Sequence, residues 1–127
     1  MRKVLIAEDD PAIALLLQEA IGERLGVATQ VVPNGALVPD ALGAERPDLL
    51  VLDLSLPGLS GLDVFDLVRN DPVWQGIPVL FLTADPERAE TASAPIGQHR
   101  VMGKPFDVDE LVATIAALVG PGAEAAA

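Results

Sequence analysis

The sequence from residue 49 to residue 53 reads Leu49-Leu50-Val51-Leu52-Asp53, an apolar run that ends on a carboxylate. A short continuous apolar run is typical of a strand with both faces covered, as in a parallel sheet. Other such runs, at residues 4–7, 79–82 and more weakly 100–102, are also followed by polar residues. The carboxyl ends of parallel strands lie along one edge of the sheet, where ligands bind. We therefore expect a functional site where these runs end.

Residues between the apolar runs follow helical periodicity. Asp10-Pro11 combines an N-cap with a proline at the first helical position and precedes a predicted helix. Residues 29–32 are predicted to form a further strand, and residues 60–69 a further helix. Asp107 and Glu110 form a capping pattern before a last helix. Strands that alternate with helices predict an α/β fold, a three-layer αβα sandwich around a parallel sheet.

Two segments are less regular. Asn34-Gly35 begins a region that is predicted to be helical only in part, because Pro39 would break the interior of a helix. Asp85-Pro86 repeats the cap-and-proline pattern and predicts another helix. Residues 1–119 are predicted to form one domain. Residues 120–127 are small and without periodicity, which predicts a disordered tail.

The composition argues against several classes of partner. The 127 residues carry a formal net charge of -11, whereas a nucleic-acid backbone or an anionic lipid surface attracts positive charge. We therefore expect no direct contact with nucleic acid and none with a membrane. The chain has no cysteine, which rules out a disulfide framework and a thiolate metal site. No apolar stretch resembles a signal peptide or approaches the roughly 20 residues that cross a bilayer, so a soluble cytoplasmic protein is predicted.

The residues that follow the apolar runs suit phosphoryl chemistry. Asp53 carries a carboxylate that can attack phosphorus and form an acyl phosphate. Glu8 and Asp9 can hold Mg²⁺, which prefers oxygen ligands, and three adjacent carboxylates would repel one another without a cation. Lys104 supplies a positive charge for the oxygens of a phosphoryl group, and Thr83 supplies a hydroxyl donor.

Taken in order along the chain, these motifs resemble the receiver domain of bacterial two-component response regulators. The resemblance covers nearly the whole chain. It implies a flavodoxin-like fold with five parallel strands in the order 2-1-3-4-5. The matching segments are Val4-Leu5-Ile6-Ala7-Glu8-Asp9-Asp10-Pro11, Leu50-Val51-Leu52-Asp53-Leu54-Ser55-Leu56-Pro57-Gly58 with Gly61, Leu80-Phe81-Leu82-Thr83-Ala84, and Lys104-Pro105-Phe106.

The resemblance implies a role for each matching position. Asp53 would be the phosphoryl acceptor. Asp9 would bind Mg²⁺ directly, Glu8 would act mostly through water, and the backbone carbonyl of Ser55 would complete the protein ligands beside Asp53. The phosphoryl donor would be a sensor histidine kinase or a histidine phosphotransfer protein. The domain would be a signalling module, not an enzyme with other substrates, and would catalyse only its own phosphorylation and dephosphorylation.

The resemblance implies that Asp53, Thr83 and Lys104 are the catalytic residues, and that Thr83 and Val101 form the switch. Lys104 would pair with the phosphoryl group, and Thr83 would move toward that group after phosphorylation. The family usually has a switch aromatic three residues before the lysine. Val101 stands at this position, so the chain departs from the family pattern in the segment that usually signals to partners.

Two alternatives from other classes remain open. A phosphorylation-independent, receiver-like interaction scaffold is favoured by Val101 and opposed by the intact acidic residues. A phosphohydrolase of the haloacid-dehalogenase type also uses an aspartate nucleophile with Mg²⁺. Such enzymes typically place a second aspartate two residues after the first, where this chain has Ser55. A monomer or a weak homodimer is expected, which acts alone or as part of a longer chain.

Overall fold

The computed structural model describes residues 2–84 and 99–119 of the chain. The helix predicted after Asp85-Pro86 and the tail predicted at residues 120–127 lie outside the described residues. The described elements, in chain order, are β1 (Lys3–Ala7), α1 (Pro11–Leu25), β2 (Ala28–Val32), the 3₁₀ helix η1 (Gly35–Leu37), α2 (Val38–Ala44), β3 (Leu49–Asp53), α3 (Gly61–Asn70), β4 (Val79–Thr83), β5 (His99–Gly103) and α5 (Val108–Val119).

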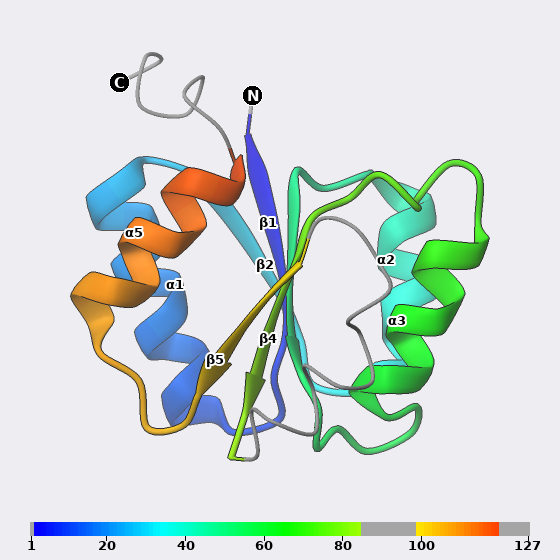
Figure 1. Ribbon diagram of the computed structural model, residues 1–127, viewed down its shortest axis with the longest axis horizontal. Helices are drawn as coiled ribbons and strands as arrows, with labels where there is room; N and C mark the ends of the chain where they lie inside the picture. Colours follow the sequence, from blue (N-terminus) through cyan, green and yellow to red (C-terminus); the bar gives the residue numbers. More distant parts are fainter. Residues whose placement is uncertain (1, 85–98, 120–127) are drawn as a thin grey trace.

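The five strands form one parallel sheet in the order β2-β1-β3-β4-β5. This order and the α/β layers confirm the predicted fold class. The run at residues 49–53 is the central strand β3, and it is buried at every position, as is β4. Because the strands are parallel, their carboxyl ends lie along the same edge of the sheet, which is the lower edge in Figure 1.

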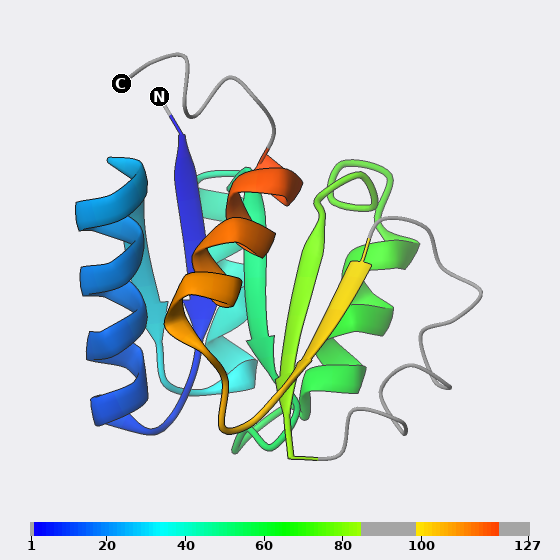
Figure 2. The same cartoon turned by 60° about the vertical axis from the view of Figure 1, so that its left-hand side comes forward.

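Helices cover both faces of the sheet. Figures 1 and 2 show α1 and α5 against one face and α2 and α3 against the other. Alternate residues of each inner strand point into the two cores, so Leu50 and Leu52 pack on the α2 and α3 side while Val51 packs on the α1 and α5 side. Two-sided burial is why β3 is apolar at four consecutive positions. Within the part of the chain that the structure describes, no helix has the length and apolar character that a bilayer span needs.

The helix that contains Pro39 departs from its prediction. The region after Asn34-Gly35 is helical only in part, as predicted, because a 3₁₀ turn precedes α2. Pro39 does not break the interior of that helix, however. It lies in the first turn of α2, where a missing N–H leaves no helical hydrogen bond unmade. The prediction that Pro39 interrupts a helix was therefore wrong, because the helix begins at Val38.

Side-chain caps begin three of the helices at the carboxyl edge of the sheet. Asp10 Oδ1 accepts the Ala12 N–H at 2.9 Å, which confirms that Asp10 caps α1. Ser60 Oγ accepts the Asp63 N–H at 3.2 Å before α3. Asp107 Oδ1 accepts two backbone N–H groups at the start of α5. The capped ends set where each helix starts relative to the site.

Gly61 lets α3 start against the backbone of the central strand. A Cβ atom at Gly61 would lie 2.5 Å from the carbonyl oxygen of Asp53 and 2.7 Å from the Cα atom of Leu54. These are backbone atoms, so they cannot move aside as a flexible side chain would. The Gly61 N–H also donates to the Leu54 carbonyl at 3.2 Å. A hydrogen atom in place of a side chain therefore allows helix and strand to meet at the site.

We expect Gly61→Ala to destabilise the domain by about 1–3 kcal/mol, because the new methyl group forces the loop between β3 and α3 away from Asp53. Urea denaturation monitored by circular dichroism measures the loss in the free energy of unfolding. Gly22→Ala is the matched control. Gly22 lies within α1, and a Cβ atom there would meet no other part of the protein within 4 Å, so alanine should stabilise by about 0.5–1 kcal/mol. Equal stability of Gly61→Ala and wild type would contradict this close packing of helix and strand.

Candidate functional site

The predicted site residues come together at the carboxyl edge of the sheet. Glu8 and Asp9 follow β1, Asp53 ends β3, Thr83 ends β4 and Lys104 follows β5. Glu8 is 2% exposed, Asp53 3% and Thr83 7%, which are low values for polar residues. Residues from four strands thus meet in one partly enclosed place, as the ends of the apolar runs predicted.

Lys104 joins two of the carboxylates directly. Its Nζ atom lies 2.9 Å from Glu8 Oε1 and 3.1 Å from Asp53 Oδ2, within hydrogen-bond distance of both. The Lys104 side chain is only 21% exposed, so solvent screens these ion pairs less than it screens a surface pair. The Lys104–Pro105 peptide bond is cis. This ammonium is the positive charge that compensates the buried acids in the described structure.

The three carboxylates are arranged as a cation site would require. One ligand oxygen from each of Glu8, Asp9 and Asp53 lies within 4.8 Å of the others. Hard oxygen ligands of this kind suit Mg²⁺ and Ca²⁺. Three carboxylates and the Lys104 ammonium leave two negative charges, which is the charge that one divalent cation neutralises. The donor set and its charge therefore fit a magnesium ion.

Backbone groups hold the two buried carboxylates in place. Glu8 Oε2 accepts the Asp10 N–H at 3.1 Å, and Asp53 Oδ1 accepts the Ser55 N–H at 3.0 Å. Each carboxylate thus uses one oxygen for the backbone and presents the other to Lys104. Among the described residues, no buried side-chain oxygen or nitrogen lacks a hydrogen-bond partner. The acids are oriented before any ligand arrives.

The surroundings shift the three pKa values in different directions. Burial raises the pKa of Glu8, and the Lys104 ammonium only partly offsets this rise. Burial also opposes ionisation of Asp53, but the Ser55 N–H, Glu8 and Lys104 outweigh it and lower the pKa of Asp53. Burial disfavours the Lys104 ammonium, yet its bonds to the two acids prevail and raise its pKa. Asp53 is therefore anionic and Lys104 cationic at neutral pH.

Thr83 and Val101 lie on adjacent strands beside this cluster. The Lys104 N–H donates to the Thr83 carbonyl at 2.8 Å, which joins the ends of β4 and β5. Val101 is opposite Phe81 in the strand register and packs, half-buried, against the core on the α2 and α3 side. Val101 is thus a strand residue that contacts the core, two positions before the end of β5.

Sequence reasoning missed the pairing of Lys104 with Glu8. It assigned Lys104 to a phosphoryl group and Glu8 to a metal ion, whereas in the structure the two side chains contact each other. They are 96 residues apart, so no local pattern connects them. The available signal was the order of the strands, since β1 and β5 are separated only by β3 and β4 and all four end at the same edge.

We expect Lys104→Met to destabilise the magnesium-free protein by about 2–3 kcal/mol at pH 7, because two buried carboxylates lose their cation. The loss should shrink as the pH falls from 7 toward 4.5, the ordinary value for glutamate. The pKa of Glu8 is raised in the folded state, and a group of that kind favours folding at low pH. Asp53 has a lowered pKa, so its stabilising contribution is lost only below its ordinary value of 3.8, outside this range.

Urea denaturation in EDTA at pH 7 and pH 5 measures both effects. Lys3→Met is the matched control, because the Lys3 side chain is 15% exposed, much like that of Lys104, but its Nζ atom pairs at 2.9 Å with Glu45, whose side chain is 67% exposed. Removing Lys3 leaves no buried carboxylate without a cation, so the loss of this pair should cost about 0–1 kcal/mol. If Lys104→Met lowers the free energy of unfolding equally at the two pH values, the loss comes from packing of the lysine side chain and not from its charge.

Comparison with known proteins identifies the family. Residues 4–116 match the family described as response regulator receiver domain. The chain is 36% identical over 118 residues to the DNA-binding response regulator MtrA of Mycolicibacterium smegmatis, covering 91% of this chain and 50% of that protein. It is 42% identical over 122 residues to the response regulator protein PmrA of Pseudomonas aeruginosa, covering 91% of this chain and 52% of that protein. The chain thus spans about half the length of these curated relatives.

Solved structures show the same fold. The receiver domain of a signal transduction histidine kinase from Syntrophus aciditrophicus is 30% identical, with a TM-score of 0.83 over 94% of this chain and 90% of that one. The receiver domain of a sensor histidine kinase from Pseudomonas aeruginosa, solved with a magnesium ion coordinated in its active-site cleft, is 24% identical. Its TM-score is 0.81 over 94% of this chain and 98% of that one. The match over residues 4–116, together with these relatives, places the chain in the response regulator receiver domain family.

Proposed function

We propose that Asp53 is the residue on which this receiver domain accepts a phosphoryl group. The observation that carries the proposal is the position of the Asp53 carboxylate. It lies 3% exposed at the end of the central strand, with Lys104 Nζ 3.1 Å from one oxygen and a backbone N–H 3.0 Å from the other. The Lys104 ammonium is a strong attraction for an incoming phosphoryl anion that the carboxylate alone would repel.

The proposed transfer uses the carboxylate as nucleophile. One oxygen of Asp53 bonds to phosphorus as the bond from phosphorus to a histidine nitrogen of the donor breaks, and the freed imidazole takes up a proton. The acyl phosphate then carries its charge on phosphoryl oxygens, to which Lys104 can turn from Glu8 and Asp53. Hydrolysis returns the carboxylate and releases inorganic phosphate. The domain thereby catalyses only its own phosphorylation and dephosphorylation.

Glu8, Asp9, Asp53 and the backbone carbonyl of Ser55 are the groups that would hold Mg²⁺. Support comes from the three carboxylate oxygens within 4.8 Å of one another and from the magnesium-containing receiver domain of similar fold. When bound, the ion would neutralise negative charge on the phosphoryl group and the acids. Glu8 is held by Lys104 and a backbone N–H, which suits contact with the ion through water.

Thr83 and Val101 are proposed to report the phosphorylation state. Thr83 ends β4 beside Lys104, so its hydroxyl can reach an added phosphoryl group after a small movement. Val101 stands where the family usually has an aromatic residue, and it packs against the core in β5. A switch of this kind shifts a conformational equilibrium only by the difference in contacts between its two states. The valine gives the switch no large side chain to move.

The proposed donor is a sensor histidine kinase or a histidine phosphotransfer protein. Residues 1–119 form the proposed receiver unit, which is monomeric or weakly dimeric. Relatives of twice the length include a DNA-binding response regulator, and this chain covers half of that protein. With a net charge of -11, the 127 residues themselves are proposed to make no direct contact with nucleic acid.

Incubation with acetyl phosphate and Mg²⁺ is expected to add one phosphoryl group to the wild-type protein, detected by intact-mass spectrometry. Asp53→Asn should remove the incorporation, because an amide oxygen is a poor nucleophile. Asp10→Asn is the matched control next to the site, since asparagine caps a helix as well as aspartate does. Incorporation into Asp53→Asn at the wild-type level would refute Asp53 as the acceptor. Absence of any incorporation, with no amide-spectrum change on adding beryllofluoride, would favour the phosphorylation-independent scaffold.

Magnesium is expected to stabilise the wild-type protein against thermal unfolding. At a concentration 100 times the dissociation constant, the gain is about 2.7 kcal/mol, because the ion binds only the folded site. Asp9→Asn should lose most of the gain, whereas Asp10→Asn should keep it. Differential scanning calorimetry over a magnesium titration measures the difference. An equal gain in both variants would place the ion elsewhere on this acidic chain.

A further inference from the structure

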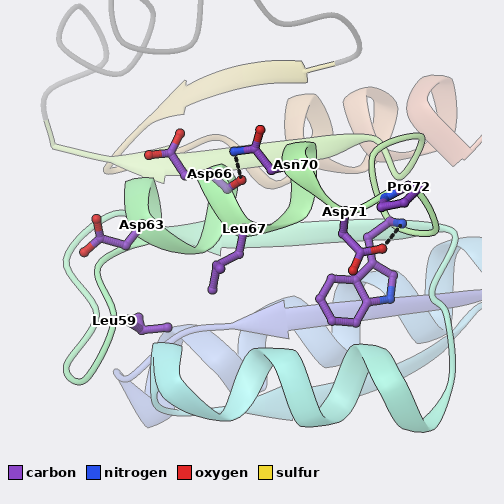
Figure 3. Close-up of a pocket in the computed structure, with 8 residues that line it drawn as sticks. Leu59, Asp63, Asp66, Leu67, Asn70, Asp71 and Pro72 are labelled. Atoms are coloured by element: carbon purple, nitrogen blue, oxygen red, sulfur yellow. Dashed lines mark hydrogen bonds between the residues drawn. The ribbon is translucent and has the colours of Figure 1, made fainter.

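A groove of about 490 Å³ lies along α3 (Figure 3), and none of its lining residues belongs to the acidic cluster. Its floor is apolar. Leu59 lies at one end of the groove and Leu67 in the middle of α3 (Figure 3), and Trp74 also lines the groove. Leu59 and Trp74 pack half-buried against the core on this side, while Leu67 is 45% exposed. The apolar surface of the groove is therefore continuous with the hydrophobic core and is partly exposed to solvent.

Acidic residues line the groove together with this apolar floor. The described residues that line the groove include three aspartates and neither a lysine nor an arginine. Arg69 pairs with one of them, its Nε atom 3.2 Å from Asp66 Oδ1, at a position where both side chains are well exposed. Asp71 is held in place because its Oδ1 atom accepts the Val73 N–H at 2.8 Å. The three aspartates of the rim are Asp63, Asp66 and Asp71.

We propose that this groove binds a basic amphipathic segment of a partner protein. An apolar side chain of the segment enters between Leu67 and Trp74, and its lysine or arginine side chains face the aspartates. Helices commonly dock in this way, with apolar anchors on one face and charges on the flanks. An arginine can in addition stack on the Trp74 ring.

The chemistry of the groove disfavours other occupants. A second copy of this chain would bring a further net charge of -11 against an acidic rim. Nucleic acid and anionic lipid would be repelled for the same reason. A small inorganic cation would leave the apolar floor uncovered. A positively charged segment with apolar anchors satisfies both the floor and the rim.

This inference goes beyond phosphoryl transfer. None of the lining residues belongs to the cluster of Glu8, Asp53 and Lys104, and the groove lies on α3 and the segments that flank it. Failure of Asp53 to accept a phosphoryl group would leave the groove and its charge unchanged. The two proposals can therefore fail separately.

Trp74 provides the measurement, because it is the one tryptophan in the sequence. The probe is a synthetic peptide with leucine and lysine at helical spacing, titrated into the wild-type chain. We expect the fluorescence emission of Trp74 to shift to shorter wavelength as the peptide is added, and the shift to saturate. Two control peptides, one with serine for each leucine and one with glutamate for each lysine, should bind at least tenfold more weakly. Equal binding of the leucine and serine peptides would show attraction by net charge alone and would overturn the proposal.

Paired variants separate the groove from the rest of the acidic surface. Leu67→Gln should raise the dissociation constant at least fivefold, whereas Leu15→Gln, at a 55% exposed position on α1, should change it less than twofold. Asp63→Asn should raise it about threefold and Glu19→Gln, on α1, less than twofold. Equal effects within either pair would contradict the proposal.

Two measurements guard these comparisons. Circular dichroism checks that each variant folds, and if Leu67→Gln does not, Asp63→Asn and the three peptides still decide the outcome. Sedimentation velocity over a range of protein concentrations tests self-association. A dimer that Leu67→Gln abolishes would show that a second copy is the occupant and would refute a basic partner segment.

Discussion

The arrangement of this domain depends on holding carboxylates close together at a place where solvent screens their repulsion only weakly. Glu8 and Asp53 are almost fully buried, and with Asp9 they bring three carboxylate oxygens within 4.8 Å. Such a group is unfavourable unless cations face it, because burial removes the solvation of each charge. Lys104 meets part of this demand, and the negative charge that remains suits a divalent cation. The same excess of negative charge would favour a positive ion at the site.

The fold makes this arrangement possible by covering the sheet on both faces. Strands β3 and β4 have no exposed position, so their ends are set by two cores and not by local preference. Gly61 then allows α3 to start against the backbone of Asp53, closer than any side chain would permit. Rigid strands and a tightly packed helix start hold the acids together against their repulsion. A looser scaffold would let the carboxylates separate.

Acidity has different consequences at the end of the sheet and along α3. At the end of the sheet, Glu8 and Asp53 are buried, hydrogen-bonded and paired with one ammonium, and the exposed Asp9 lies beside them. Along α3, the exposed Asp63 and Asp66 and the half-buried Asp71 line a groove with Leu59, Leu67 and Trp74, where solvent screens the charges more than it does at the end of the sheet. The first arrangement suits a small, highly charged group. The second suits a larger partner, for which area and charge both contribute.

The sequence by itself determined the alternation of strands and helices, because apolar periodicity and caps are local. It also determined that Asp53 and Lys104 would meet, because parallel strands end at one edge. The tertiary structure decided the contact between Lys104 and Glu8, which are 96 residues apart. It likewise decided where the helix containing Pro39 starts, and that Trp74 would share a groove with residues of α3. These features depend on how packed helices and strands are positioned against one another. No local stretch of sequence determines those positions.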